Sequence, residues 1–87
     1  MTPIGAAKKI HAILKAAGIE TGPMKHIAKR EAFFECGFED CCFVYVRAVD
    51  DNSVDVEVTT DNPMDPRSIE TVHTIREILN INGRAVH

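Results

Sequence analysis

The chain has 87 residues and a mass of 9.6 kDa, the size of one small domain, and we expect a single domain over residues 1–87. Hydrophobic residues make up 45% and charged residues 26% of the chain, which excludes a disordered tail, a coiled-coil rod and a low-complexity linker. The formal net charge of −3 excludes a polybasic nucleic-acid binder, and no apolar run is long enough to span a bilayer.

The first predicted element is an amphipathic helix that begins at Thr2-Pro3. A threonine before a proline is a strong helix start, because the hydroxyl caps a free backbone N–H and proline fits the first helical position. The helix is expected to end at Gly18, a typical residue just beyond a last turn. Its apolar residues recur at helical spacing and are Ile4, Ala7, Ile10, Leu14 and Ala17.

Residues 20–27 contain Gly22-Pro23 and are predicted to form a connection. From there to residue 60 the hydrophobic period becomes two, which indicates strands. Asp50-Asp51-Asn52 is the predicted turn between the second and third of them. The apolar faces are Ala32, Phe34, Cys36 and Phe38 in the first strand, Cys42, Val44, Val46 and Ala48 in the second, and Val54, Val56 and Val58 in the third.

Asp65-Pro66 opens a second helix by the same combination of cap and proline, and Asn82-Gly83 is expected to end it. Its apolar stripe is Ile69, Val72, Ile75, Ile78 and Leu79. Each helix has one apolar stripe and the sheet has one apolar face. We therefore predict an α+β fold, a two-layer α-β-β-β-α sandwich in which both helices pack on one face of a three-stranded antiparallel meander.

Side-chain parity restricts how the strands pair. If even-numbered residues face the core in all three strands, the residue numbers of two opposite residues must add to an even number. We predict Cys36 opposite Cys42 in the first hairpin and Asp50 opposite Val54 in the second.

The same pairings determine which side chains lie opposite each other on the outer face, the side of the sheet that points away from the helices. Arg47 of the middle strand is expected between Glu31 and Glu57, which is a favourable cross-strand arrangement. Phe33 is expected opposite Tyr45. The apolar residues of this outer face are Phe33, Phe43, Tyr45 and Val49.

Two helices cover only one side of a sheet, so these apolar residues should be exposed. An apolar patch with a charged rim is typical of a protein-binding surface. We predict a small, non-enzymatic, intracellular interaction module that forms a homodimer or acts as an adaptor for another protein. Its expected partner-binding residues are Phe33, Phe43, Tyr45, Arg47 and Val49. The competing interpretation is that the tail or the connection at residues 20–27 covers them.

Charge is distributed unevenly along the chain. Residues 1–30 hold six basic residues and one acid, whereas residues 31–70 hold eleven acids and two arginines. A second hypothesis follows, in which an acidic face imitates phosphates. The protein would then be an accessory inhibitor, of the kind that phages and mobile elements encode, for a basic nucleic-acid-processing protein. The residues of this acidic rim are Glu39, Asp40, Asp50, Asp51, Asp55 and Asp61. The alternative is that they only keep the protein soluble.

The cysteines and histidines form no catalytic or metal-binding motif. Cys36, Cys41 and Cys42 are too few for a disulfide framework. Cys41 and Cys42 are expected to point to opposite faces of a strand, so that both cannot bind one metal ion. We expect no catalytic residue, no metal and no cofactor. Without a secretory signal, the protein is expected to be cytoplasmic and its thiols free.

The α-β-β-β-α order resembles that of double-stranded-RNA-binding domains. Those domains begin their second helix with lysines that bind phosphates, whereas residues 65–68 here are Asp-Pro-Arg-Ser. The outer aromatic residues could stack on single-stranded bases, but the carboxylates around them would repel phosphates. We therefore expect neither nucleic acid nor a membrane as a partner.

Overall fold

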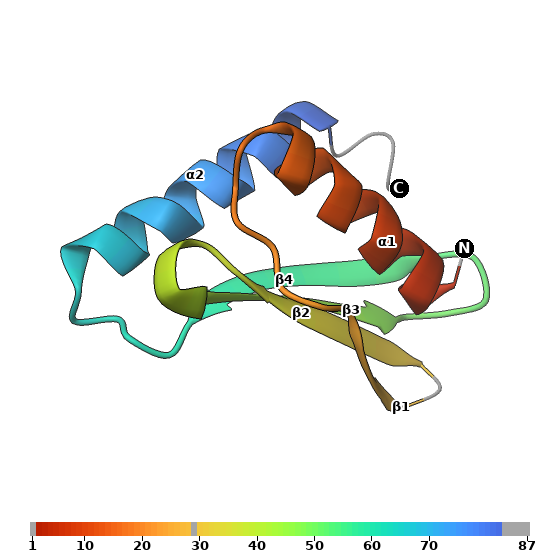
Figure 1. Cartoon of the computed structure of the whole chain (residues 1–87). Coiled ribbons are helices and arrows are strands. Elements are labelled where there is room, and N and C mark those ends of the chain that lie inside the picture. Colours follow the sequence, from red (N-terminus) through yellow and green to blue (C-terminus); the bar gives the residue numbers. More distant parts are fainter. Residues whose placement is uncertain (1, 29, 83–87) are drawn as a thin grey trace.

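The computed structural model describes residues 2–28 and 30–82 (Figure 1). Its elements are α1 (Pro3–Ala16), β1 (Lys25–Ala28), β2 (Glu31–Cys36), the 3-10 helix η1 (Phe38–Asp40), β3 (Cys42–Ala48), β4 (Val54–Thr60) and α2 (Pro66–Asn82). The strands form one antiparallel sheet in the order β1-β2-β3-β4. Both α1 and α2 lie on one face of this sheet, and no described element lies over the other face (Figure 1). The predicted two-layer α+β fold is confirmed.

The fourth strand, β1, is an addition that the sequence does not indicate. Part of the predicted connection over residues 20–27 pairs with β2 instead, with Lys25 opposite Phe33. The approach to β1 is held to β2 as well, since the Gly22 N–H donates to the Glu35 carbonyl at 2.8 Å. β1 has four residues and an irregular register near its end, so backbone pairing forms it without a hydrophobic period. It widens the sheet and does not cover its outer face.

α1 begins and ends as the sequence predicts. Thr2 Oγ1 accepts a hydrogen bond from the Gly5 N–H at 3.1 Å, and Pro3 occupies the first helical position. Gly18 follows the helix with φ of 87°, a backbone conformation that glycine adopts at little cost. Ile10 and Leu14 of the predicted stripe are fully buried, which anchors α1 on β2 and β3.

α2 also begins at its predicted cap. Asp65 Oδ1 accepts a hydrogen bond from the Arg67 N–H at 2.9 Å, and Val72 and Ile75 are buried. The apolar stripe does not account for Ser68, which is fully buried and whose hydroxyl has no hydrogen-bond partner in the described chain. The predicted helix end at Gly83 and the tail after it lie outside the described residues.

The core lies between the helices and the even-numbered side of the sheet. Its largest member is Phe34 of β2, with no exposed surface. The His11 ring of α1 packs edge-on against Phe34 at 5.0 Å between centroids, and His11 Nε2 lies 2.9 Å from the Gly22 carbonyl oxygen. These contacts give His11 a structural role. The other large, fully buried side chains are Ile10, Leu14, Ile75, Val44 and Val46.

The register of the first hairpin is confirmed, whereas that of the second is wrong by two residues. β2 and β3 pair with Cys36 opposite Cys42. β3 and β4 pair with Ala48 opposite Val54, so Asp50 is not paired with Val54. The reason lies in the loop, where Asp50 Oδ1 accepts hydrogen bonds from the N–H groups of Asn52 and Ser53, at 2.8 Å and 2.9 Å. Asp50 is therefore a turn residue, and the predicted parity of the faces is kept.

Candidate protein-binding face

Three aromatic rings lie together on the outer face, the side of the sheet opposite α1 and α2. Phe33 of β2 and Tyr45 of β3 stack with their centroids 5.3 Å apart and their planes 17° from parallel. Phe43 of β3 lies 6.2 Å from Tyr45, tilted by 38°. All three side chains are half-buried, and none belongs to the hydrophobic core. The three aromatic residues predicted to bind a partner are thus brought into one cluster.

Strand pairing explains why Phe33 and Tyr45 stack. The Ala48 N–H donates to the Arg30 carbonyl on the β2 side at 2.8 Å. Even-numbered residues of β3 therefore direct their backbone groups toward β2, and Tyr45 directs its own toward β4. Phe33 and Tyr45, which are opposite each other, form a non-hydrogen-bonded pair. Side chains in such pairs approach more closely than in hydrogen-bonded ones, so the stacked pair is built into the register.

Two ion pairs border the aromatic cluster. On one side Lys25 Nζ lies 5.7 Å from the Phe33 centroid and 3.5 Å from a Glu35 carboxylate oxygen. On the other side Arg47 Nη2 bonds Glu57 Oε2 at 3.0 Å. Lys25 is a member of the face that sequence patterns miss, because β1 shows no periodicity.

The neighbours of Arg47 differ in part from the prediction. Arg47 lies opposite Glu31 as expected, but the residue opposite it on β4 is Asp55 rather than Glu57. The two-residue shift of the second hairpin causes this change, and the contact with Glu57 becomes diagonal. Arg47 therefore stands among three carboxylates, and it remains exposed.

Val49 does not lie on the sheet itself. It follows the last residue of β3, and 63% of its surface is exposed. Its N–H donates to the Ser53 carbonyl at 3.0 Å and closes the loop between β3 and β4. Val49 thus stands at the end of the outer face, one loop away from the aromatic cluster.

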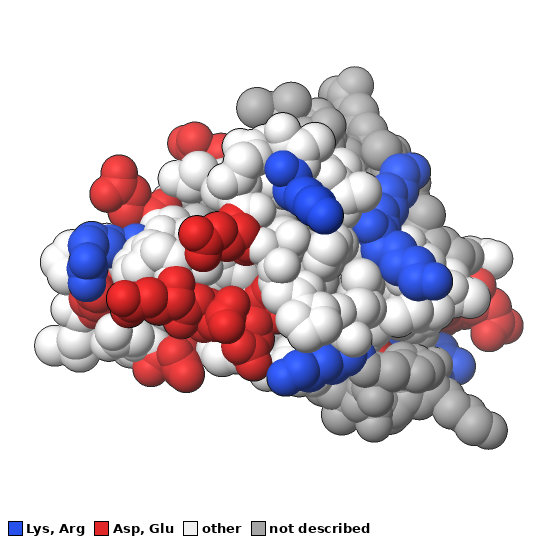
Figure 2. Space-filling view, viewed as in Figure 1, with Lys and Arg blue, Asp and Glu red and all other residues white. Residues whose placement is uncertain are grey.

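The acidic rim is divided between the two ends of the sheet. Figure 2 shows carboxylates gathered at the end of the molecule where η1 lies and basic side chains over α1. The seven residues of β3 separate the two ends by about 20 Å. Near η1 and the end of β4 are Glu39, Asp40 and Asp61; in or after the loop between β3 and β4 are Asp50, Asp51 and Asp55. Only Asp55 lies on the outer face of a strand.

The cysteines lie on the other side of the sheet, in the core. Cys41 and Cys42 do not point to opposite faces as predicted, since their sulfur atoms are 3.3 Å apart. Cys41 precedes β3 and has helical backbone angles, φ −71° and ψ −15°, so the alternation of a strand does not apply to it. Cys36 is opposite Cys42, and all three thiols are free and buried. In the described ranges, no cluster of three histidine, cysteine or acidic residues is placed to hold a metal ion.

Burial should make the Cys36 and Cys42 thiols unreactive in the folded protein. Desolvation raises the pKa of Cys36 and of Cys42 to about 12 from 9.0. Because the unfolded thiols lose their protons first, the free energy of unfolding should fall as the pH rises from about 9 toward 12. The Cys41→Ala variant isolates these two thiols, and we expect thiolate absorbance from it near pH 9 when it is unfolded in urea, which is the control, but not when it is folded. Thiolate absorbance from the folded variant at pH 9 would contradict this.

Comparison with known proteins gives no relative for this chain. No protein-family model, no curated protein and no solved structure matches it. Among the described residues, no helix has the length and apolar character needed to cross a membrane. The chemistry of the outer face is therefore the basis for inferring a function.

Proposed function

We propose that this protein is a non-enzymatic, intracellular protein-interaction module that binds a partner through its outer face. The observation that carries the proposal is the cluster of Phe33, Tyr45 and Phe43 on a sheet face that no described element covers. An aromatic stack on the solvent side of a sheet loses contact with water when a partner covers it, and this loss is favourable.

The composition of the face supports the same function. Tyrosine, phenylalanine and arginine are enriched in protein interfaces, where a few aromatic or arginine residues carry most of the binding energy. Here Tyr45 contacts both phenylalanines, which places it at the centre of the cluster. Arg47 lies beside it and exposes about half of its side chain, 48%. A central aromatic group with charges at its border is the arrangement that protein-binding sites use.

Charge favours a different protein over a second copy as the partner. The described side chains of the outer face include four carboxylates and two cations. A two-fold contact between identical copies would bring this net negative face against itself, which is unfavourable. A partner that supplies positive charge around an apolar centre fits better. The charged residues of the face are Glu31, Glu35, Asp55, Glu57, Lys25 and Arg47.

The acidic-inhibitor hypothesis receives less support from the placement of the carboxylates. Asp50 and Asp51 lie in the loop after β3, and Glu39 and Asp40 lie at the opposite end of that strand. An interface that used all of them would have to extend past both ends of the sheet. Under this hypothesis, replacing Asp50 and Asp51 by lysine would abolish binding, and binding would weaken steeply with added salt.

Tyr45→Ala should weaken binding to the natural partner about 10- to 30-fold. The substitution removes the ring that contacts both phenylalanines, and truncating a central aromatic residue typically costs about 2 kcal/mol of binding energy. The measurement is quantitative affinity capture from extract of the cells in which the protein occurs, followed by titration of the captured partner. Light scattering of the purified complex then tells a second copy from another protein.

Met64→Ala is the matched control for this experiment. Met64 is 88% exposed and lies between β4 and α2, outside the aromatic cluster. The Met64→Ala variant should bind the partner with the same affinity as the unchanged protein. Equal capture by the unchanged protein and by Tyr45→Ala, with both folded by circular dichroism, would refute binding through the aromatic cluster.

A further inference from the structure

The edge of β4 presents backbone groups that the sheet leaves unpaired. β4 is the last strand of the sheet. The Val49 N–H donates to the Ser53 carbonyl, so odd-numbered residues bond across the hairpin and even-numbered residues of β4 direct their backbone groups outward. The Val58 carbonyl confirms that even-numbered residues point outward, because it accepts a hydrogen bond from the Arg76 side chain at 2.9 Å. The outward groups of Val54 and Val56 have no such partner within the described chain.

The two edges of the sheet differ in how open they are. β1 has four residues and a register shift, and short or irregular edges resist the addition of another strand. β4 has seven residues, pairs with β3 without a shift and contains neither proline nor glycine. A long and regular edge of this kind is a template for another strand.

The charges on β4 determine which strand can join it. Asp55 and Glu57 project from the outer face next to this edge, and both are exposed. If the β4 strands of two copies paired antiparallel about residue 55, 56 or 57, an acid would always lie opposite an acid. When the pair is centred on residue 56, for example, Asp55 of one copy lies opposite Glu57 of the other. Like charges directly opposite each other are destabilising. A strand with lysine or arginine at these positions would instead form favourable pairs.

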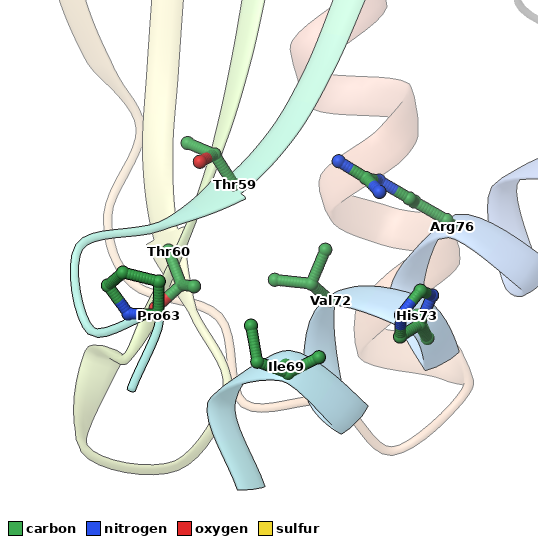
Figure 3. A pocket seen from close by; sticks show the side chains of 7 residues that line it. All are labelled: Thr59, Thr60, Pro63, Ile69, Val72, His73 and Arg76. Atoms are coloured by element: carbon green, nitrogen blue, oxygen red, sulfur yellow. The ribbon is translucent and has the colours of Figure 1, made fainter. Parts of the chain in front are cut away.

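The other side of the edge offers a place for apolar side chains. A hollow of about 210 Å³ lies between the end of β4 and α2. Figure 3 shows Ile69 and Val72 of α2 on one side of it, Thr60 and Pro63 on the other, and Arg76 reaching toward β4. Ile69 is 37% exposed. Alternate residues of an added strand point to opposite faces, so one set would meet the acids. The other set would lie on the α2 side, with the hollow at the Thr60 end of the strand.

We infer that the edge of β4 binds an extended segment of a partner protein in which basic residues alternate with apolar ones. The segment adds a fifth strand to the sheet through the outward backbone groups of Val54 and Val56. Its basic side chains pair with Asp55 and Glu57, and its apolar side chains lie toward α2. The edge shares Asp55 and Glu57 with the border of the outer face but includes none of the three aromatic rings. A backbone substitution at Val56 therefore tests the edge independently of the proposed function.

The test uses a capped seven-residue peptide of alternating lysine and valine, with a glutamate–valine peptide of the same length for comparison. Binding is measured by calorimetry, and amide hydrogen exchange is followed by NMR. We expect only the lysine peptide to bind and to slow exchange at Val54 and Val56. Failure of the lysine peptide to bind, or equal binding of both peptides, would overturn the inference.

Two variants separate the backbone from the charges. Val56→Pro removes an outward N–H that β3 does not use, and proline is tolerated on edge strands; it should abolish binding of the lysine peptide. The double variant Asp55→Asn, Glu57→Gln leaves the backbone intact and should weaken binding about tenfold. The control Glu70→Gln, Glu77→Gln changes the same charge at exposed positions of α2 and should bind normally. Unchanged affinity in the Asp55→Asn, Glu57→Gln variant would contradict the proposed pairing.

Discussion

Phe34→Ala should leave most of the chain unfolded at 25 °C. Phe34 is the largest fully buried side chain, and replacing a buried phenylalanine by alanine typically costs about 3–5 kcal/mol. A single core in a chain of this size supplies only about 3–5 kcal/mol of net stability. The loss is therefore comparable to the whole free energy of unfolding. Urea unfolding followed by circular dichroism measures it.

Phe33→Ala is the matched control for this variant. Phe33 is the preceding residue on the same strand, but it lies half-buried on the outer face. The same substitution there should cost clearly less stability, because partial burial supplies less transfer energy and no core cavity forms. Equal losses in the two variants would mean that the two faces of the sheet are buried to the same degree, which would refute the two-layer arrangement.

Gly37→Ala should also have a large effect, about 2–6 kcal/mol of lost stability. Gly37 has φ 84° and ψ 178°, a region that essentially only glycine adopts, at a cost of about 1–3 kcal/mol for other residues. An added Cβ would lie 3.0 Å from Thr71 Cγ2 and 3.1 Å from Cys41 Sγ, and overpacking adds about 1–3 kcal/mol. Thermal or urea unfolding measures the sum.

Gly18→Ala separates the cost of a positive φ from the cost of crowding around the added Cβ. Gly18 also has a positive φ, 87°, but nothing lies within 4 Å of its added Cβ. This variant should lose only the backbone contribution, about 1 kcal/mol. If Gly37→Ala costs no more stability than Gly18→Ala, the close approach of Thr71 and Cys41 to Gly37 is absent in solution.

Much of the fold follows from periodicity and capping residues. The stripe of α1 and the alternation of β2 and β3 have one consistent solution, and parity then fixes Cys36 opposite Cys42. The second hairpin has no such determinant. Val54 could pair with either of two residues without a change of face, and the hydrogen bonds of the Asp50 carboxylate decide between them. Those same bonds, the one from the Asn52 N–H first, lower the pKa of Asp50.

Two features depend on tertiary context and so escape sequence patterns. β1 forms because β2 offers it a backbone edge, and its sequence carries no alternation. Cys41 leaves the strand geometry because the chain turns through η1, where Glu39 and Asp40 have φ of 52° and 54°. Positive φ at Glu39 is not expected from propensity, since glycine, asparagine and aspartate usually take such positions.

The candidate site, like the fold, is predictable from the sequence only in part. The aromatic cluster is predictable because odd-numbered residues of β2 and β3 must share one face, and Phe33 and Tyr45 are indeed opposite. The grouping of the carboxylates is not predictable, because it depends on where the loops end in space. Lys25 joins the face only through β1.

Site-specific photo-crosslinking tests most directly whether the outer face binds a protein. A photoreactive phenylalanine analogue replaces Tyr45, and in a separate protein it replaces Lys8, which is exposed on α1. Both proteins are irradiated in the cells in which the chain occurs. The proposed function predicts a discrete crosslinked species from position 45 and none from position 8. Crosslinking from position 8 alone, or none from position 45, would contradict binding at this face.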